Sequence, residues 1–125
     1  MTENELSKLI FLASLTVHKE LGPGLLESVY EKCLYYELTH LGLKVDRQMP
    51  MPLVYKNINM STGYRLDLMV EGKVIIEIKA VEYVNDVYLA QLLTYLKLSG
   101  CKLGMLINFN VALLKTGVRR VVNGL

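Results

Sequence analysis

The sequence predicts an α/β domain, and three observations support this prediction. Apolar residues recur at a helical period from Leu6 to Leu41, and from Leu43 onward the period changes toward two. A further helical segment, 86–99, lies between two apolar segments that are typical of strands, 74–80 and 103–109. A helix in that position usually makes a right-handed crossover between parallel strands of one sheet.

The composition is that of a folded chain, and one domain is expected over residues 1–125. Hydrophobic residues make up 52% of the chain and charged residues 21%, which excludes a disordered protein. At this length a core can form without disulfides or metals. Fourteen Lys and Arg against twelve Asp and Glu give a net charge of +2. This balance neither indicates nucleic-acid binding nor excludes a small basic groove.

The cysteines and the N-terminus indicate a reduced, cytoplasmic protein. Cys33 and Cys101 lack the spacing of a zinc site, and nothing supports a disulfide between them. The acidic N-terminal segment, 1–5, differs from the basic start of a secretory signal. No run of 18 apolar residues predicts a membrane span.

The first helix is expected to begin at a capping box and to end at a glycine-rich turn. Thr2 and Glu5 have capping-box spacing, and Gly22-Pro23-Gly24 stops the helix. A second helix is expected over about 25–41, with Gly42 as its C-terminal cap. The apolar faces consist of Leu6, Leu9, Ile10, Ala13, Val17 and Leu21 in the first helix, and of Leu26, Val29, Tyr30, Cys33, Leu34 and Leu41 in the second.

The rest of the chain alternates strands with one helix. Pro50 and Pro52 restrict the segment that contains them to a sheet edge or a bulge. Gly100 closes the helix over 86–99. Strands are expected over 44–49, 64–70, 74–80 and 103–109, with a last short strand over 118–122.

The register of the hairpin over 64–80 can be predicted from its residues. With a three-residue loop Val70 faces Val74, whereas a two-residue loop would place Leu66 opposite Glu77 and mix apolar with charged side chains. Because a one-residue slip moves every side chain to the wrong face, the three-residue loop is favoured. Asp67 then lies across from Glu77. One face collects Leu66, Leu68, Val70, Val74, Ile76 and Ile78, and the other collects Arg65, Asp67, Met69, Ile75, Glu77 and Lys79.

Asp67 and Glu77 are expected to form a pair of facing carboxylates, which repel each other. A Mg²⁺ or Mn²⁺ ion between them would offset this repulsion, since hard cations prefer oxygen ligands. Lys79 would then stabilise negative charge on a phosphoryl group or help to deprotonate a water molecule. Taken alone, such a trio is more often a solvated polar face in which Lys79 and Arg65 neutralise the two acids.

Three other polar residues accompany this trio. Gln91 and Tyr95 are four residues apart and share one face of the helix over 86–99. Glu27 lies near the start of the second helix, where the helix dipole favours a carboxylate. Each of the three also has an ordinary structural explanation. Tyr95 can be a half-buried aromatic residue, Gln91 its polar neighbour on the helix, and Glu27 an acid in the first helical turn. His18 is more often a surface or capping residue than a metal ligand.

In combination these residues resemble the PD-(D/E)xK nuclease superfamily and, more narrowly, the small prokaryotic GxxExxY family. The resemblance covers about 17–121, and it implies a restriction-endonuclease-like αβββαβ core, with a mixed central sheet flanked by helices and an extra N-terminal helix. One departure is that Leu66, rather than a proline, precedes Asp67. The motifs are Gly24-Leu25-Leu26-Glu27-Ser28-Val29-Tyr30, Tyr64-Arg65-Leu66-Asp67-Leu68, Glu77-Ile78-Lys79-Ala80, Gln91-Leu92-Leu93-Thr94-Tyr95, Leu106-Ile107-Asn108-Phe109 and Gly117-Val118-Arg119-Arg120.

The resemblance also implies a role for each site residue. A Mg²⁺ or Mn²⁺ ion would be held by two acids and a main-chain carbonyl, with a helix-borne acid added to the site. Gln91 and Tyr95 resemble the QxxxY motif of RecB-like exonucleases, where this pair helps to place the substrate and the lysine. The implied metal ligands are Asp67, Glu77, Ile78 and Glu27, and the implied catalytic residues are Lys79, Asp67, Glu77, Glu27, Gln91 and Tyr95.

The function expected from these observations is metal-dependent hydrolysis of phosphodiester bonds in nucleic acid, in DNA rather than RNA. The alternative is a non-catalytic nucleic-acid-binding or protein-interaction module that retains the fold. A third class, enzymes acting on phosphorylated metabolites, lacks support because Gly22-Pro23-Gly24 reads as a helix–helix turn rather than a phosphate loop. So small a nuclease core is compatible with a homodimer.

Overall fold

The computed structural model describes residues 1–60 and 63–125 and confirms the α/β prediction. A five-stranded sheet has the order β1-β4-β5-β6-β7, in which β5 and β6 are parallel and the other neighbours are antiparallel. The elements are α1 (Glu3–Leu21), α2 (Glu27–His40), β1 (Val45–Pro50), β2 (Val54–Tyr55), β3 (Ile58–Asn59), β4 (Arg65–Val70), β5 (Val74–Lys79), α3 (Asp86–Ser99), β6 (Leu103–Asn108), the 3₁₀ helix η1 (Leu114–Gly117) and β7 (Val118–Val122).

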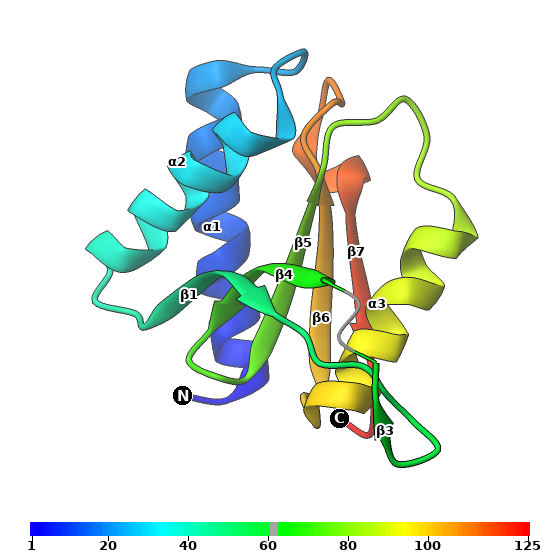
Figure 1. Ribbon diagram of the computed structural model, residues 1–125. Helices are drawn as coiled ribbons and strands as arrows, with labels where there is room; N and C mark the ends of the chain where they lie inside the picture. Colours follow the sequence, from blue (N-terminus) through cyan, green and yellow to red (C-terminus); the bar gives the residue numbers. More distant parts are fainter. Residues whose placement is uncertain (61–62) are drawn as a thin grey trace.

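The helices cover both faces of the sheet (Figure 1). Helices α1 and α2 pack on one face through a core that includes Leu6, Ile10 and Leu34. Helix α3 packs on the other face through a second core that includes Leu92 and Leu96. The chain crosses from β5 through α3 to β6, and β5 and β6 are parallel as expected from the sequence. Within the described residues, no helix is long and apolar enough to cross a membrane.

The ends of the helices follow the expected local signals. Thr2 and Glu5 form the capping box of α1, and Gly100 ends α3 in the left-handed conformation at φ 78°. Helix α2 begins at Glu27 rather than at residue 25, and Leu26 has no side-chain cap bond. Leu26 and Leu41 are 73% and 55% exposed, so their assignment to the apolar face of the second helix was wrong. The later start leaves Leu26 outside the helix, as its N-cap residue.

Strand β1 is an edge strand that ends at Pro50, as the two prolines predicted. The segment that follows contains a second, two-stranded sheet that the sequence did not predict. Strands β2 and β3 are joined by Lys56 and Asn57, whose φ angles of 49° and 67° are typical of a tight hairpin turn. Figure 1 shows this small hairpin near the C-terminal end of α3.

The three-residue loop between β4 and β5 is confirmed, since Val70 lies opposite Val74. The described pairing of these strands ends at Leu68 opposite Ile76, and β4 then diverges from β5 while it continues along β1 (Figure 1). The predicted face of Leu66 was therefore wrong. Leu66 belongs to the core under α3, whereas Leu68 belongs to the core under α1 and α2. Divergence of the strands interrupts the simple alternation of faces between these two residues.

Gly104 of β6 allows α3 to pack closely on the sheet, and replacing it is expected to destabilise the fold. A Cβ atom at residue 104 would lie 2.8 Å from both Cγ and Cδ1 of the buried Leu92. We expect Gly104→Ala to lower the free energy of unfolding by about 1–3 kcal/mol, as measured by thermal or denaturant melting. In the Gly104→Ala variant, Leu92→Ala should lower the free energy of unfolding by less than it does in wild-type protein, because it removes the clashing atoms. Simple additivity of the two losses would contradict this packing.

Candidate active site

The predicted acidic residues lie where β4 separates from β5. Beyond the last pair of the ladder, the Asp67 side chain rather than the β4 main chain binds the edge of β5. Its Oδ2 accepts the N–H of Ile78 at 2.8 Å. The N–H and C=O of one residue in an extended strand point to the same side. The carbonyl of Ile78 therefore points toward Asp67. Asp67 and Ile78 both line a cavity of about 440 Å³.

Glu27 reaches the same edge of β5 from the first turn of α2. Its Oε2 accepts the N–H of Ala80 at 3.1 Å, so two main-chain donors of this edge are each bound by a carboxylate. Glu27 is exposed and lines the same cavity as Asp67 and Ile78. The structure thus brings these predicted metal-site residues to one place.

Tyr30 fixes the turn that presents Glu27. Its hydroxyl donates to the Gly22 carbonyl at 2.6 Å and accepts the Leu25 N–H at 3.1 Å. The buried Tyr30 ring stacks on Phe109 with centroids 4.5 Å apart and planes at 5°. The tyrosine of the GxxExxY pattern therefore has a structural role here, because it holds the glycine turn against the core.

Glu77 is the buried member of the acidic pair. The residue is 8% exposed, and its Oε1 has no hydrogen-bond partner among residues 1–60 and 63–125. Burial, and next the charge of nearby Asp67, raise the pKa of Glu77 from 4.5 to about 9. A buried carboxyl with an unpartnered oxygen beside a second carboxyl is the arrangement that a bound cation would satisfy.

Lys79 follows Glu77 on β5 and is half-buried. Its Nζ lies 4.4 Å from the centroid of the Tyr88 ring, on α3, in a cation–π contact. The end of β6 and the residue after it hold the main chain that follows Lys79. Phe109 N–H donates to the Lys79 carbonyl, and the buried Asn108 side chain bonds both the N–H and the carbonyl of Val81. These contacts fix the base from which Lys79 projects.

Gln91 and Tyr95 lie on the α3 side of the sheet. Together with Tyr64 they line a separate cavity of about 210 Å³. Tyr95 is 6% exposed, and burial, followed by the charge of Glu77, raises its pKa to about 12. Tyr95 is thus electrostatically linked to the acidic pair. Gln91 is exposed and lines the α3-side cavity rather than the one that contains Asp67.

His18 lines neither the cavity that contains Asp67 nor the one that contains Gln91. It is buried rather than at the surface, and its Nε2 is 2.8 Å from the Val111 carbonyl. Its ring centroid is 6.4 Å from that of Phe109. These contacts are those of a core histidine.

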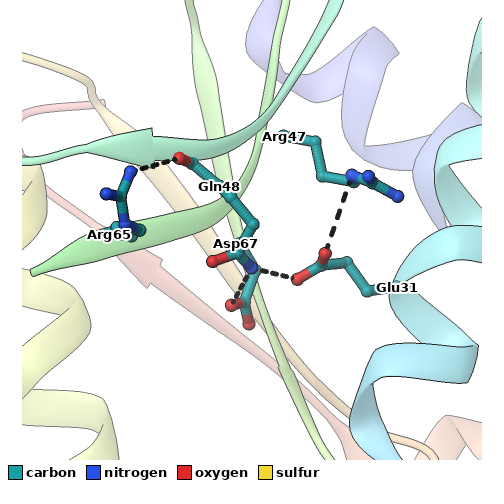
Figure 2. Close-up of polar contacts among 5 residues, drawn as sticks. All are labelled: Glu31, Arg47, Gln48, Arg65 and Asp67. Carbon is teal, nitrogen blue, oxygen red and sulfur yellow. Dashed lines mark hydrogen bonds and ion pairs between the residues drawn. The ribbon is translucent and has the colours of Figure 1, made fainter.

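Three residues around Asp67 were not singled out from the sequence. Gln48 Nε2 donates to Glu31 Oε1 at 2.6 Å and to Asp67 Oδ1 at 3.4 Å, and Arg47 lies 4.0 Å from the other oxygen of Glu31 (Figure 2). Burial raises the pKa of the Glu31 carboxyl. One signal was available in the sequence: Glu31 is four residues after Glu27, which places both acids on one face of the helix.

The donors present fit a hard divalent cation. Within residues 1–60 and 63–125, no three His, Cys, Asp or Glu side chains are grouped so that they alone could hold a metal ion. Two neighbouring carboxyls, one with an unpartnered oxygen, and the adjacent Ile78 carbonyl nevertheless form an all-oxygen set. Oxygen sets of this kind suit Mg²⁺ and Mn²⁺, which usually retain several water ligands.

Fold and site together define a restriction-endonuclease-like α/β protein, with an acidic pair and a lysine at a diverging hairpin. The chain belongs to the PD-(D/E)XK nuclease superfamily, since the family model of that description matches residues 4–121. Neither the curated proteins nor the solved structures contained a match. Membership implies a nucleic-acid substrate, and members typically use divalent metals.

Proposed function

We propose that this protein is a metal-dependent nuclease that hydrolyses phosphodiester bonds in nucleic acid, with DNA preferred over RNA. The observation that carries the proposal is the buried Glu77, which lies near Asp67 and whose Oε1 has no hydrogen-bond partner in the described part of the chain. Repulsion between the two acids is unfavourable for the fold unless a cation, or a proton, neutralises it. Membership in the nuclease superfamily supports the same function.

The proposed ligands of a Mg²⁺ or Mn²⁺ ion are Asp67, Glu77, the Ile78 carbonyl and Glu27. When bound, such an ion would activate water and stabilise negative charge on the phosphoryl oxygens. Glu27 accepts the Ala80 N–H in this structure. It would therefore join the ligand set by a side-chain rotation or through a water molecule.

Lys79 is proposed to stabilise the charge that develops on the phosphoryl group. In the reaction, water adds its oxygen to phosphorus, the bond from phosphorus to the leaving ester oxygen breaks, and that oxygen takes up a proton. The products are a phosphate monoester and a hydroxyl group. Tyr88 limits the positions of the Lys79 ammonium, and Gln91 and Tyr95 would contact the substrate from the α3 side.

Positive charge near the acidic pair supports an anionic substrate. Lys32 and Arg47 line the cavity that contains Asp67, and Arg65 is exposed beside it. Contacts of such cations with phosphates release counterions, so binding of nucleic acid should weaken steeply as salt is raised. An affinity that is insensitive to salt would argue against this substrate class.

The alternative function is a non-catalytic module that binds nucleic acid or a protein. Exposed apolar residues on and beside the β2–β3 hairpin favour a protein contact, which could include a second copy of the chain. The exposed fractions are 53% for Val54, 54% for Tyr55, 62% for Ile58 and 49% for Met60.

Hydrolysis of end-labelled and circular substrates tests the proposal. Duplex DNA, single-stranded DNA and RNA would be incubated with the protein in Mg²⁺, in Mn²⁺ and in EDTA. We expect cleavage of DNA with either ion, none in EDTA, and none with Asp67→Asn. Cleavage in EDTA, or equal cleavage by Asp67→Asn, would contradict the proposal. Salt-sensitive binding without cleavage under any condition would favour the non-catalytic module.

A further inference from the structure

Gln48 has an unusual backbone conformation for a residue within a strand. Its φ is +53°, in the left-handed region that non-glycine residues rarely adopt. The other non-glycine residues with positive φ in the described ranges, Lys56, Asn57 and Glu71, lie in hairpin turns. Such a conformation costs of the order of 1 kcal/mol or more, and it persists only where surrounding contacts impose it.

The unusual conformation occurs next to Asp67. In the described ladder between β1 and β4, Arg47 pairs with Leu68 and Met49 pairs with Leu66, while Gln48 is skipped. Its carbonyl, freed from the ladder, accepts a hydrogen bond from Arg65 Nη1 at 3.3 Å (Figure 2). The local distortion of β1 therefore coincides with the position across from the candidate metal ligand.

The distortion directs the side-chain amide of Gln48 to two carboxylates. Nε2 is 2.6 Å from Glu31 Oε1 and 3.4 Å from Asp67 Oδ1. A carboxylate only accepts hydrogen bonds, so the NH₂ group of the amide must face both acids. Asp67 then has one oxygen directed to Gln48 and the other bound to the Ile78 N–H at 2.8 Å. These two contacts define the plane of its carboxylate.

We propose that Gln48 is a positioning residue, whose left-handed backbone places its amide between Glu31 and Asp67 and so orients Asp67 for the cation. Gln48 would not touch the substrate or the ion. Helix α2 would take part through Glu31, which anchors the amide from the opposite side. This inference rests on the proposed function, since it concerns the same cation site.

Two substitutions separate the amide from the backbone conformation. Gln48→Gly removes the amide and relieves the strain, because glycine adopts positive φ freely. Gln48→Met also removes the amide but keeps the strain and the side-chain length. We expect the thermal stability of the first to be equal to or above that of the second. The matched control is Lys56→Gly, which relieves a φ of 49° in the β2–β3 turn, away from the site.

Two readouts test the assignment: the Mn²⁺ dissociation constant from calorimetry, and the hydrogen-exchange rate of the Ile78 amide in metal-free protein. We expect both Gln48 variants to bind Mn²⁺ about tenfold more weakly, as is typical when a group that orients a ligand is lost. Their Ile78 amide should exchange faster, while Lys56→Gly changes neither quantity. Affinity within twofold of wild type and an unchanged exchange rate in Gln48→Gly would overturn the assignment.

A failure of the proposed function gives a different result. If wild-type protein did not bind Mn²⁺, or bound it as tightly as Glu77→Gln does, the cation site itself would be refuted. The role of Gln48 toward a cation would be refuted with it. The exchange rate of the Ile78 amide would still report whether Gln48 holds the Asp67 carboxylate in place. The two failures are therefore distinguishable.

Discussion

Replacing Lys79 with alanine is expected to reduce the rate of phosphodiester cleavage by about 10³-fold, with little change in Mn²⁺ affinity. An ammonium group that faces developing negative charge typically contributes this much to a rate. Its removal leaves Asp67, Glu77 and the Ile78 carbonyl in place, so the oxygen donors of the ion remain. Cleavage would be measured under single-turnover conditions, and Mn²⁺ affinity by calorimetry on the same protein.

The control for this variant is Lys102→Ala. Lys102 is exposed and directly precedes β6, at the opposite end of the parallel pair from Lys79. Loss of a lysine there changes net charge equally, and we expect cleavage within about twofold of wild type. Cleavage by Lys79→Ala at the level of Lys102→Ala would remove Lys79 from the mechanism.

Replacing Glu77 with glutamine is expected to stabilise the metal-free protein at neutral pH, although it abolishes cleavage. The pKa of Glu77 is raised from 4.5 to about 9 by burial and by the charge of Asp67. Ionisation of this carboxyl therefore opposes folding. The glutamine side chain has nearly the same shape, carries no charge and can donate to the Asp67 carboxylate.

The pH dependence of this effect has a definite sign. The contribution of Glu77 is most favourable below pH 4.5, where the carboxyl is protonated in both states, and it is lost as the pH rises toward 9. Each pH unit in this window changes the free energy of unfolding by about 1.4 kcal/mol at most. In EDTA, the melting temperature of Glu77→Gln should exceed that of wild type by more at about pH 8 than at about pH 5. Destabilisation by Glu77→Gln at both pH values would identify Glu77 as a structural residue.

The sequence predicted those parts of the fold that depend on local patterns. The bounds of α3 and β7 were predicted to the residue, and Gly100 marks the end of α3. The three-residue loop between Val70 and Val74 followed from the alternation of the strands that it joins. Each of these features is specified by residues within about ten positions of one another in the chain.

Features that depend on strand divergence could not be predicted in the same way. The face of Leu66 changes because β4 pairs with β5 only from Leu68 onward, and nothing local in the sequence predicts where this pairing begins. The contacts of Gln48 with Glu31 and Asp67 join β1, α2 and β4. The secondary-structure propensity of a residue does not predict a tertiary contact among three such elements.

The acidic pair and the lysine were recognised from their order and spacing, together with the motifs that accompany them. The predicted register places Asp67 across from Glu77, but the described pairing ends at Leu68 opposite Ile76, and the Asp67 carboxylate instead accepts the N–H of Ile78. Glu27 reaches the same edge of β5. That Gln91 and Tyr95 line a cavity separate from that of Asp67 was not foreseen, because their four-residue spacing predicts a shared helix face but not the cavity that this face lines.

The most direct test of the central claim is paramagnetic broadening of amide NMR signals by substoichiometric Mn²⁺. We expect the signals of Asp67, Ile78 and Lys79 to broaden first in wild-type protein, and Glu77→Gln to abolish this selective broadening. Such a result would place the ion at the diverging hairpin without any knowledge of the substrate. Broadening centred on another part of the chain, or unchanged by Glu77→Gln, would contradict the claim that the Asp67–Glu77 pair holds the metal.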